Sequence, residues 1–125
     1  MFSVKVDVIH SVLELHLGGP FTEQQLSDFA QELKSVFESL PEPPEGVLFE
    51  RKNARPANQH ASQLLVIVCE FIRDSGASRF ADVGSTDVPG LTYDINTRRF
   101  VSEEEGRRWL LQSAASALND SKHRC

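Results

Sequence analysis

The sequence predicts an α/β domain with a mixed sheet of four to five strands, in the order β-β-α-β-α-β-(β)-α. Three observations lead to this class. The chain opens with two short segments in which apolar and polar residues alternate, as they do in half-buried strands. Residues 21–40 and 102–118 have the caps and apolar spacing of amphipathic helices. Short apolar runs lie between the helical segments, which is typical of parallel strands joined by right-handed helical crossovers.

Length and composition fit one globular domain. The chain has 125 residues and a net charge of −5, and we assign residues 1–118 to a single domain and residues 119–125 to a flexible tail. The acidic balance argues against nucleic-acid binding, because phosphate contacts need clustered Lys and Arg. Residues 1–17 lack the regions of a secretion signal, and no apolar run reaches the ~20 residues of a membrane span. We therefore expect a cytoplasmic protein with no membrane insertion.

The first two strands are expected to pair with each other. In residues 2–9 and again in residues 12–17, apolar side chains recur at every second position. His10 and Ser11 between them indicate a tight turn, and such a short connection joins antiparallel neighbours. Gly18 and Gly19 end the pair.

Residues 21–40 have the start and stop signals of a helix. Thr22 is a good N-cap, and Gln25 follows at the spacing of a capping box. Phe21 and Leu26 have the spacing of a hydrophobic staple. Pro41 ends the helix, because proline disfavours the helical conformation of the residue before it.

The middle of the chain contains a strand, a loop and a second helix. Residues 47–49 are wholly apolar, as expected of a strand covered on both faces. Residues 51–58 are polar and are expected to form a loop. Residues 57–74 are ambiguous, because the apolar run at 64–72 also fits a buried strand. The length of the segment, its helical spacing of apolar residues and Gly76 at the C′ position favour a helix.

Short strands and a last helix complete the predicted order. Residues 79–83 and 91–95 are strand candidates, separated by a loop at 84–90. Ser102 and Glu105 then form a second capping box that starts the last helix, with Val101 placed as its hydrophobic staple.

Three stretches carry a family resemblance. They are Gly18-Gly19-Pro20-Phe21-Thr22 before the first helix, Arg73-Asp74-Ser75-Gly76-Ala77 at the end of the second, and the run from Phe100 to Glu105 before Arg107-Arg108-Trp109-Leu110. In this order of elements they resemble the STAS superfamily, the fold of bacterial anti-sigma-factor antagonists and of cytoplasmic domains of anion transporters. The resemblance covers most of the chain. It implies a STAS-like fold and a non-enzymatic, regulatory or scaffold module that binds a protein partner in bacterial-type signalling.

One departure from the family concerns its switch. Phosphorylated STAS proteins have Asp-Ser-Ser-Gly-Leu at the start of the second helix, and the first of these serines accepts the phosphate. The nearest run here is His60-Ala61-Ser62-Gln63-Leu64, which places the switch position on Ala61. The resemblance therefore does not extend to the phosphorylation switch, and Ser62 is the alternative acceptor.

Five residues around the predicted start of the second helix form the candidate site, and they are Arg51, Lys52, Arg55, His60 and Ser62. Helix N-termini favour anions, and ligands of open α/β sheets bind beyond the carboxyl ends of the strands. The leading hypothesis is a contact with a protein partner, of which self-association is one form. The alternative is a small anionic or apolar ligand at the same end of the sheet. Equally, these charges fit a solvated loop with no binding role.

Other groups of polar residues in the sequence do not indicate a metal site or a catalytic site. Asp82, Asp87 and Asp94 fit no calcium-binding spacing and are interpreted as loop and strand-end carboxylates. The histidines never pair at zinc-ligand spacing. Cys69 lies in an apolar run that disfavours its thiolate, which argues against a nucleophile–base pair with His60. We therefore expect no metal, no cofactor and no enzymatic activity.

Overall fold

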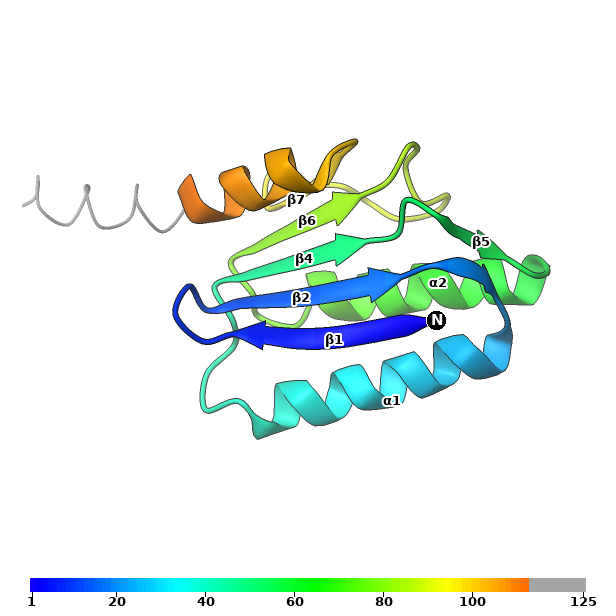
Figure 1. Cartoon of the computed structure of the whole chain (residues 1–125), viewed down its shortest axis with the longest axis horizontal. Coiled ribbons are helices and arrows are strands. Elements are labelled where there is room, and N and C mark those ends of the chain that lie inside the picture. Colours follow the sequence, from blue (N-terminus) through cyan, green and yellow to red (C-terminus); the bar gives the residue numbers. More distant parts are fainter. Residues whose placement is uncertain (113–125) are drawn as a thin grey trace, which may run out of the picture.

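The computed structural model describes residues 1–112, which form a five-stranded mixed sheet as predicted (Figure 1). The strands lie in the order β1-β2-β4-β6-β7, with β1 antiparallel to β2 and all other neighbours parallel. A separate two-stranded sheet joins β3 to β5. The strands are β1 Phe2–Asp7, β2 Val12–Leu17, β3 Gly19–Phe21, β4 Gly46–Glu50, β5 Ala54–Pro56, β6 Arg79–Val83 and β7 Thr97–Phe100.

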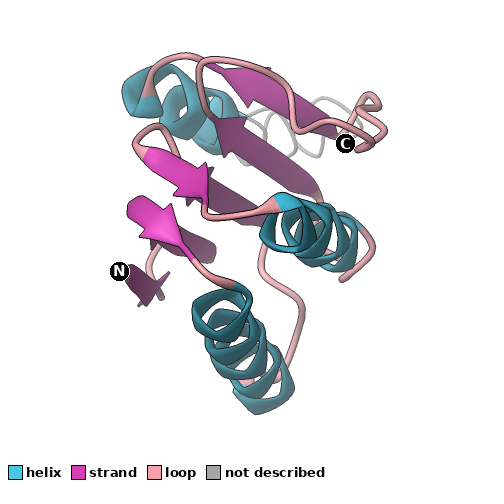
Figure 2. Ribbon diagram, turned by 90° about the vertical axis from the view of Figure 1, so that its right-hand side faces the viewer, coloured by secondary structure: helices cyan, strands magenta, loops and turns pink. Residues whose placement is uncertain are grey.

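Helices cover both faces of the large sheet. α1 (Glu23–Ser39) and α2 (Gln59–Arg73) lie on one face, and the helical residues 103–112 lie on the other (Figure 2). β4 shows why its sequence is apolar throughout. Val47 and Phe49 enter the main core under α1 and α2, whereas Leu48 enters the smaller core under residues 103–112. The predicted strand covered on both faces is confirmed.

The first helix starts as its sequence predicts. Thr22 Oγ1 accepts a hydrogen bond from Gln25 N at 3.2 Å, and Gln25 Oε1 accepts one from Thr22 N at 2.9 Å. Phe21 and Leu26 are both fully buried, as a staple requires. The second helix is also confirmed, and Asn58 is its N-cap, with Oδ1 accepting from Ala61 N at 2.8 Å.

Gly106 of the last helix lies directly against the side chains of the sheet. A Cβ atom at this position would lie 3.2 Å from Leu48 Cδ1 and from Val83 Cγ2, so a side chain there would push the helix away. Ser102 Oγ accepts from Glu105 N at 3.2 Å, as a cap does. The predicted staple from Val101 is wrong: its partner position is Gly106, which has no side chain, and Val101 is exposed.

The strand predicted at residues 91–95 is wrong. Residues 84–96 form a loop, in which Leu91 is buried but Ile95 is exposed, so the alternating pattern does not follow a sheet. Asp94 turns the chain, because its Oδ1 accepts from Asn96 N at 2.8 Å and its carbonyl accepts from Thr97 N at 3.3 Å. β7 begins only after this turn.

The loop predicted at residues 51–58 contains a short strand. β5 pairs in parallel with β3, and Ala57 N donates to the carbonyl of Phe21 at 2.8 Å. The polar segment is therefore fastened next to the start of α1. The predicted tail at 119–125 and the last residues of the predicted helix lie outside the described residues. Within residues 1–112, no helix combines the length and apolar character needed to cross a bilayer.

Candidate functional site

Arg51 and Asp82 meet where two neighbouring parallel strands end. Arg51 directly follows β4, and Asp82 lies in β6 beside it. Arg51 Nε donates to Asp82 Oδ1 at 2.6 Å, and Arg51 Nη2 donates to Asp82 Oδ2 at 2.8 Å. The two side chains are 10% and 0% exposed, so this is a buried, bidentate ion pair.

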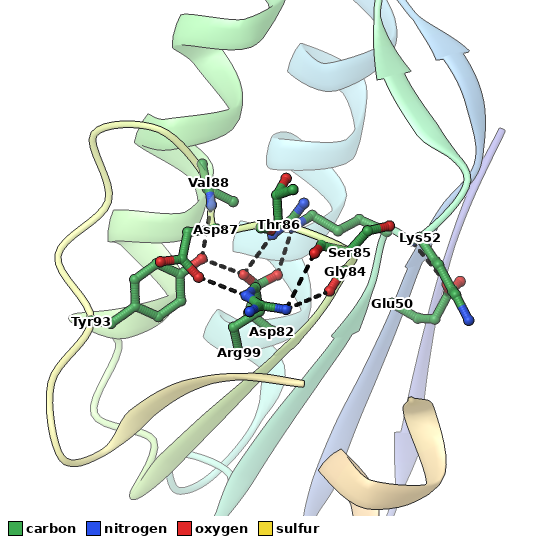
Figure 3. Close-up of polar contacts among 11 residues, drawn as sticks. Glu50, Lys52, Asp82, Gly84, Ser85, Thr86, Asp87, Val88, Tyr93 and Arg99 are labelled. Carbon is green, nitrogen blue, oxygen red and sulfur yellow. Dashed lines mark hydrogen bonds and ion pairs between the residues drawn. The ribbon is translucent and has the colours of Figure 1, made fainter. Parts of the chain in front are cut away.

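Tyr93 and the backbone of the loop at 84–96 supply further hydrogen bonds around the Arg51–Asp82 pair (Figure 3). The Tyr93 hydroxyl donates to Asp82 Oδ2 at 2.5 Å and accepts from Val88 N at 2.9 Å. Arg51 Nη2 also donates to the carbonyl of Thr86 at 2.6 Å. Both charges are thus compensated by several hydrogen bonds, which a buried ion pair needs in order to offset its desolvation. We call Arg51, Asp82 and Tyr93 the buried triad.

Arg99 of β7 holds the same loop from its other side. Its Nε donates to Asp87 Oδ1 at 2.6 Å, and its Nη1 donates to the carbonyls of Gly84 and Ser85 at 3.2 and 3.4 Å (Figure 3). The loop at 84–96 has no regular secondary structure, so these side chains supply partners for its backbone. The triad and Arg99 together fix this loop beside the carboxyl ends of β4 and β6.

Burial and pairing set the protonation of these groups. Burial alone lowers the pKa of Arg51, but the hydrogen bonds and charge of Asp82 raise it above the ordinary value overall. Burial, followed by the hydrogen bond to Asp82, raises the pKa of Tyr93. Burial also raises the pKa of the Cys69 thiol, with a smaller contribution from the charge of Asp82. Tyr93 and Cys69 are therefore neutral and Arg51 is charged at physiological pH.

The structure separates the five predicted site residues into two groups. Arg51 points into the protein, and its guanidinium is paired with the Asp82 carboxylate. Lys52, Arg55 and His60 are exposed, and Ser62 is half-buried in the first turn of α2. Within residues 1–112, the side chains of these four make no hydrogen bond or ion pair with other side chains or with the backbone. The run that resembles the family switch has Ala61 fully buried at the corresponding position.

Sequence reasoning missed the partners of Arg51. Asp82 and Tyr93 are 31 and 42 residues further along the chain, and neither stands in a motif. Asp82 had one usable signal, since a carboxylate inside the short strand at 79–83 is costly to bury without a cation. Tyr93 and Arg99 gave none, because their roles depend on the path of the loop at 84–96.

A hollow of about 540 Å³ lies at the same end of the sheet, but it does not contain the cationic residues. Its walls include His16 and Leu17 at the end of β2, together with Glu50 and Asn53. His16 Nδ1 lies 3.5 Å from Glu50 Oε2, so the polar lining, to which Ser3 and Asn53 also belong, includes a carboxylate beside a histidine. This lining does not favour an anion. Among the described residues, no three His, Cys, Asp or Glu side chains are grouped as a metal site would need.

Comparison with known proteins identifies the architecture. No family model matches the sequence, and no curated protein matches it. A Shewanella loihica protein of SpoIIAA-like fold superposes on 87% of this chain and 93% of its own, with a TM-score of 0.60 and 14% identity. The chain has the SpoIIAA-like fold.

Two further solved structures share this fold. An anti-sigma factor antagonist from Mycobacterium paratuberculosis covers 88% of this chain and 94% of its own, with a TM-score of 0.59 and 11% identity. The phosphorylated form of the Bacillus cell-fate determinant SpoIIAA covers 86% and 98%, with a TM-score of 0.56 and 10% identity. The predicted STAS-like fold is thereby confirmed, and at these identities the likeness concerns the fold alone.

Proposed function

We propose that this SpoIIAA-like domain is a non-enzymatic regulatory or scaffold module that binds an acidic protein partner. The contact surface consists of residues 51–58 and the first turn of α2. Lys52 and Arg55 supply its positive charge, with His60 and Ser62 beside them at the helix N-terminus. Solved proteins of the same fold include anti-sigma factor antagonists, which supports a regulatory role.

The observation that carries the proposal is that Arg51 is buried and paired, whereas Lys52 and Arg55 are exposed. The buried triad neutralises Arg51 internally and ties two loops together, whereas Lys52 and Arg55 remain exposed without an internal partner in the described residues. On a chain with a net charge of −5, a small unpaired basic surface on a rigid base favours an acidic counterpart. We therefore give Arg51 a positioning role and the four other residues the contact.

Protein binding is favoured over a small anionic ligand. The described hollow at this end of the sheet is lined by His16 and Glu50 and by none of the four contact residues. Lys52 and Arg55 lie on an open surface, where a small anion stays hydrated but a protein surface excludes water over a larger area. Catalysis by Cys69 is disfavoured because its thiol is buried and the pKa of the thiol is raised.

The test is capture of partners from native lysate by tagged protein, read by mass spectrometry. Wild type is compared with Lys52→Glu/Arg55→Glu, which reverses two exposed charges and leaves the triad intact. Arg51 is not substituted, because a carboxylate in its place would lie beside buried Asp82 and unfold the domain. The matched control is Lys34→Glu/Arg108→Glu, which makes the same change in net charge elsewhere on the surface.

We expect one protein to be recovered with wild type and with the control, and lost with Lys52→Glu/Arg55→Glu. Recovery of the same protein with all three forms would place the contact elsewhere and contradict the proposed surface. If no form recovers a specific protein, thermal stabilisation of wild type by inorganic phosphate or carboxylates is measured next, since a ligand that binds only the folded state raises its stability. Stabilisation that Lys52→Glu/Arg55→Glu abolishes would replace the partner with an anion.

A further inference from the structure

The outer edge of β1 is open. β1 is an end strand of the large sheet, and β2 is its only partner strand among the described residues (Figure 1). Gly18 N donates to the Met1 carbonyl at 2.9 Å, and Met1 N donates to the Gly18 carbonyl at 3.2 Å, so these two residues form a hydrogen-bonded pair. Because such pairs alternate along an antiparallel ladder, the backbone groups of Phe2, Val4 and Val6 point away from β2. Within residues 1–112, no strand lies beside them.

This edge lacks the usual protection against pairing. Exposed edge strands are commonly blunted by a proline, by a bulge or by a covering loop. β1 contains no proline, and its register with β2 is unbroken from Phe2 to Asp7. Val8 and Ile9 just beyond it are 83% and 90% exposed. The only blunting charge is Lys5, and it is followed two positions later by Asp7 on the same face of the strand.

The order of charges makes β1 complementary to itself. In an antiparallel pair of two β1 strands with Val6 opposite Val6, each Lys5 lies opposite Asp7 of the partner subunit. β1 ends at Asp7, so residues 5–7 of the two copies form the paired segment. Val6 then forms the hydrogen-bonded pair, and Lys5 and Asp7 form the closer, non-hydrogen-bonded pairs, where side chains interact most strongly. Shifting the register one step in either direction places Lys5 opposite Lys5, or Asp7 opposite Asp7. Charge therefore favours this register over its two neighbours.

We propose that this protein forms a two-fold dimer by antiparallel pairing of β1 with β1 of a second copy, with Val6 opposite Val6. The pairing joins two five-stranded sheets into one and satisfies the outward backbone groups of Val6 in both edge strands. It brings the two exposed Val6 side chains together on one face and forms two ion pairs on the other.

Two details of the hairpin support the ion pairs. His10 Nδ1 lies 2.8 Å from Asp7 Oδ2, and His10 N donates to Asp7 Oδ1 at 3.2 Å. The side-chain hydrogen bond from His10 lowers the pKa of Asp7, so this carboxylate is charged at neutral pH. Lys5 is exposed and lies opposite Glu14 in the β1–β2 ladder, but Glu14 is ion-paired with Arg107, and Lys5 forms no ion pair in the described residues.

The dimer does not depend on the proposed function. Asp7 pairs with Val12 at the beginning of β2, whereas Arg51 follows the end of β4, which runs parallel to β2. The interface therefore lies at the opposite end of the sheet from Lys52 and Arg55. A partner protein and a second copy can bind at the same time, and each proposal can fail without the other.

The test is the dissociation constant of the full chain by sedimentation equilibrium over a concentration series. Lys5→Asp and Asp7→Lys each replace two attractive pairs with two repulsive ones, and we expect each to weaken the dimer about tenfold or more. The double variant Lys5→Asp/Asp7→Lys exchanges the charges, so it restores complementarity and the dimer. Circular dichroism checks that each variant is folded.

A third variant tests the backbone. Val6→Pro removes an outward N–H group that β2 does not use, so it blocks the pairing of two β1 strands while the β1–β2 ladder keeps its bonds. The proposal is overturned if wild type stays monomeric at every concentration. It is equally overturned if the single-charge variants and Val6→Pro dimerise as wild type does, or if the charge exchange fails to restore a dimer lost in both single variants.

Discussion

Asp82 is a full negative charge in the interior, and Arg51 compensates it. The carboxylate is completely buried and bonded to Arg51 through both oxygens. Pairs of this kind contribute little net stability relative to an apolar substitute, but removal of one partner leaves an uncompensated charge. The structural value of the triad is therefore that it holds the loop at 84–96 against the end of β4.

Replacing Arg51 with an apolar residue is expected to destabilise the protein strongly. For Arg51→Met we expect the free energy of unfolding to fall by about 3–5 kcal/mol, because Asp82 remains buried with only Tyr93 as a donor. Urea denaturation measures this change. The control Arg55→Met removes an exposed, unpaired guanidinium from the neighbouring loop and is expected to change stability by less than about 0.5 kcal/mol. Equal losses in the two variants would contradict the assignment of the triad.

Gly84 provides the space in which the Arg51 guanidinium lies. A Cβ atom at this position would be 2.7 Å from Arg51 Cζ, and the guanidinium cannot move aside without losing Asp82 and Thr86. We expect Gly84→Ala to cost about 1–3 kcal/mol of unfolding free energy, as overpacking does. Gly18→Ala is the matched control, since no atom lies within 4 Å of its Cβ position. A Gly84→Ala protein as stable as this control would show that the guanidinium is free to move.

The raised pKa of Cys69 and Tyr93 predicts a loss of stability in alkali. The ordinary pKa is 9.0 for a cysteine and 10.0 for a tyrosine, and both groups stay protonated in the folded state above these values. The unfolded chain then releases protons that the folded chain retains, so stability falls as pH rises. The slope expected from Cys69 is about 1.4 kcal/mol per pH unit above pH ~9. Urea denaturation across this range measures it.

Two variants separate the alkaline contributions. Cys69→Ala should remove the part of the decline that begins near pH 9, and Tyr93→Phe should remove the part that begins near pH 10, whatever their stability at neutral pH. An unchanged slope in both variants would show that neither group titrates differently in the folded and unfolded states.

Sequence patterns identified residues at this scale but not their partners. Arg51 was found as part of a basic cluster, which is a local property of the chain. Its burial depends on the parallel register that brings β6 beside β4, and on a loop whose path no periodicity encodes. Asp82 was interpreted as a strand-end carboxylate, which places it correctly in β6 but gives no sign of its partner.

At the scale of elements, the N-cap of α2 fixes where the proposed contact surface begins. Asn58 is the cap, and it satisfies the backbone N–H of Ala61. Asn58→Ala is expected to lower the free energy of unfolding by about 1 kcal/mol, whereas Asn58→Asp should retain the cap. Thermal unfolding of the two variants measures the difference. An alanine variant as stable as wild type would mean that the first turn is held by β5 and not by its cap.

Helices and strands were predicted correctly where their signals lie in neighbouring residues. α1 was predicted from its capping box and staple, both of which involve neighbours within five residues. The strand predicted at 91–95 was wrong because its alternation is produced by the burial of Leu91 and the two hydrogen bonds of the Tyr93 hydroxyl, and not by a sheet. β5 was missed because it is three residues long and depends on pairing with β3, which is remote in sequence.

At the scale of the whole molecule, the two proposed surfaces lie at opposite ends of the sheet. The parallel strands β4 and β6 end beside the buried triad, and the β1–β2 hairpin lies at the other end. A dimer formed through β1 presents two copies of the basic surface, one on each subunit. Two linked contacts strengthen binding to a partner that is itself repeated or dimeric.

The most direct test of the central proposal is hydrogen–deuterium exchange of this protein, alone and with the partner captured by wild type. Slower exchange is expected in residues 51–62, and β1 should be unchanged by the partner. With Lys52→Glu/Arg55→Glu, the partner should produce no protection. Protection confined to another surface, with residues 51–62 exchanging as in the free protein, would contradict the proposed contact.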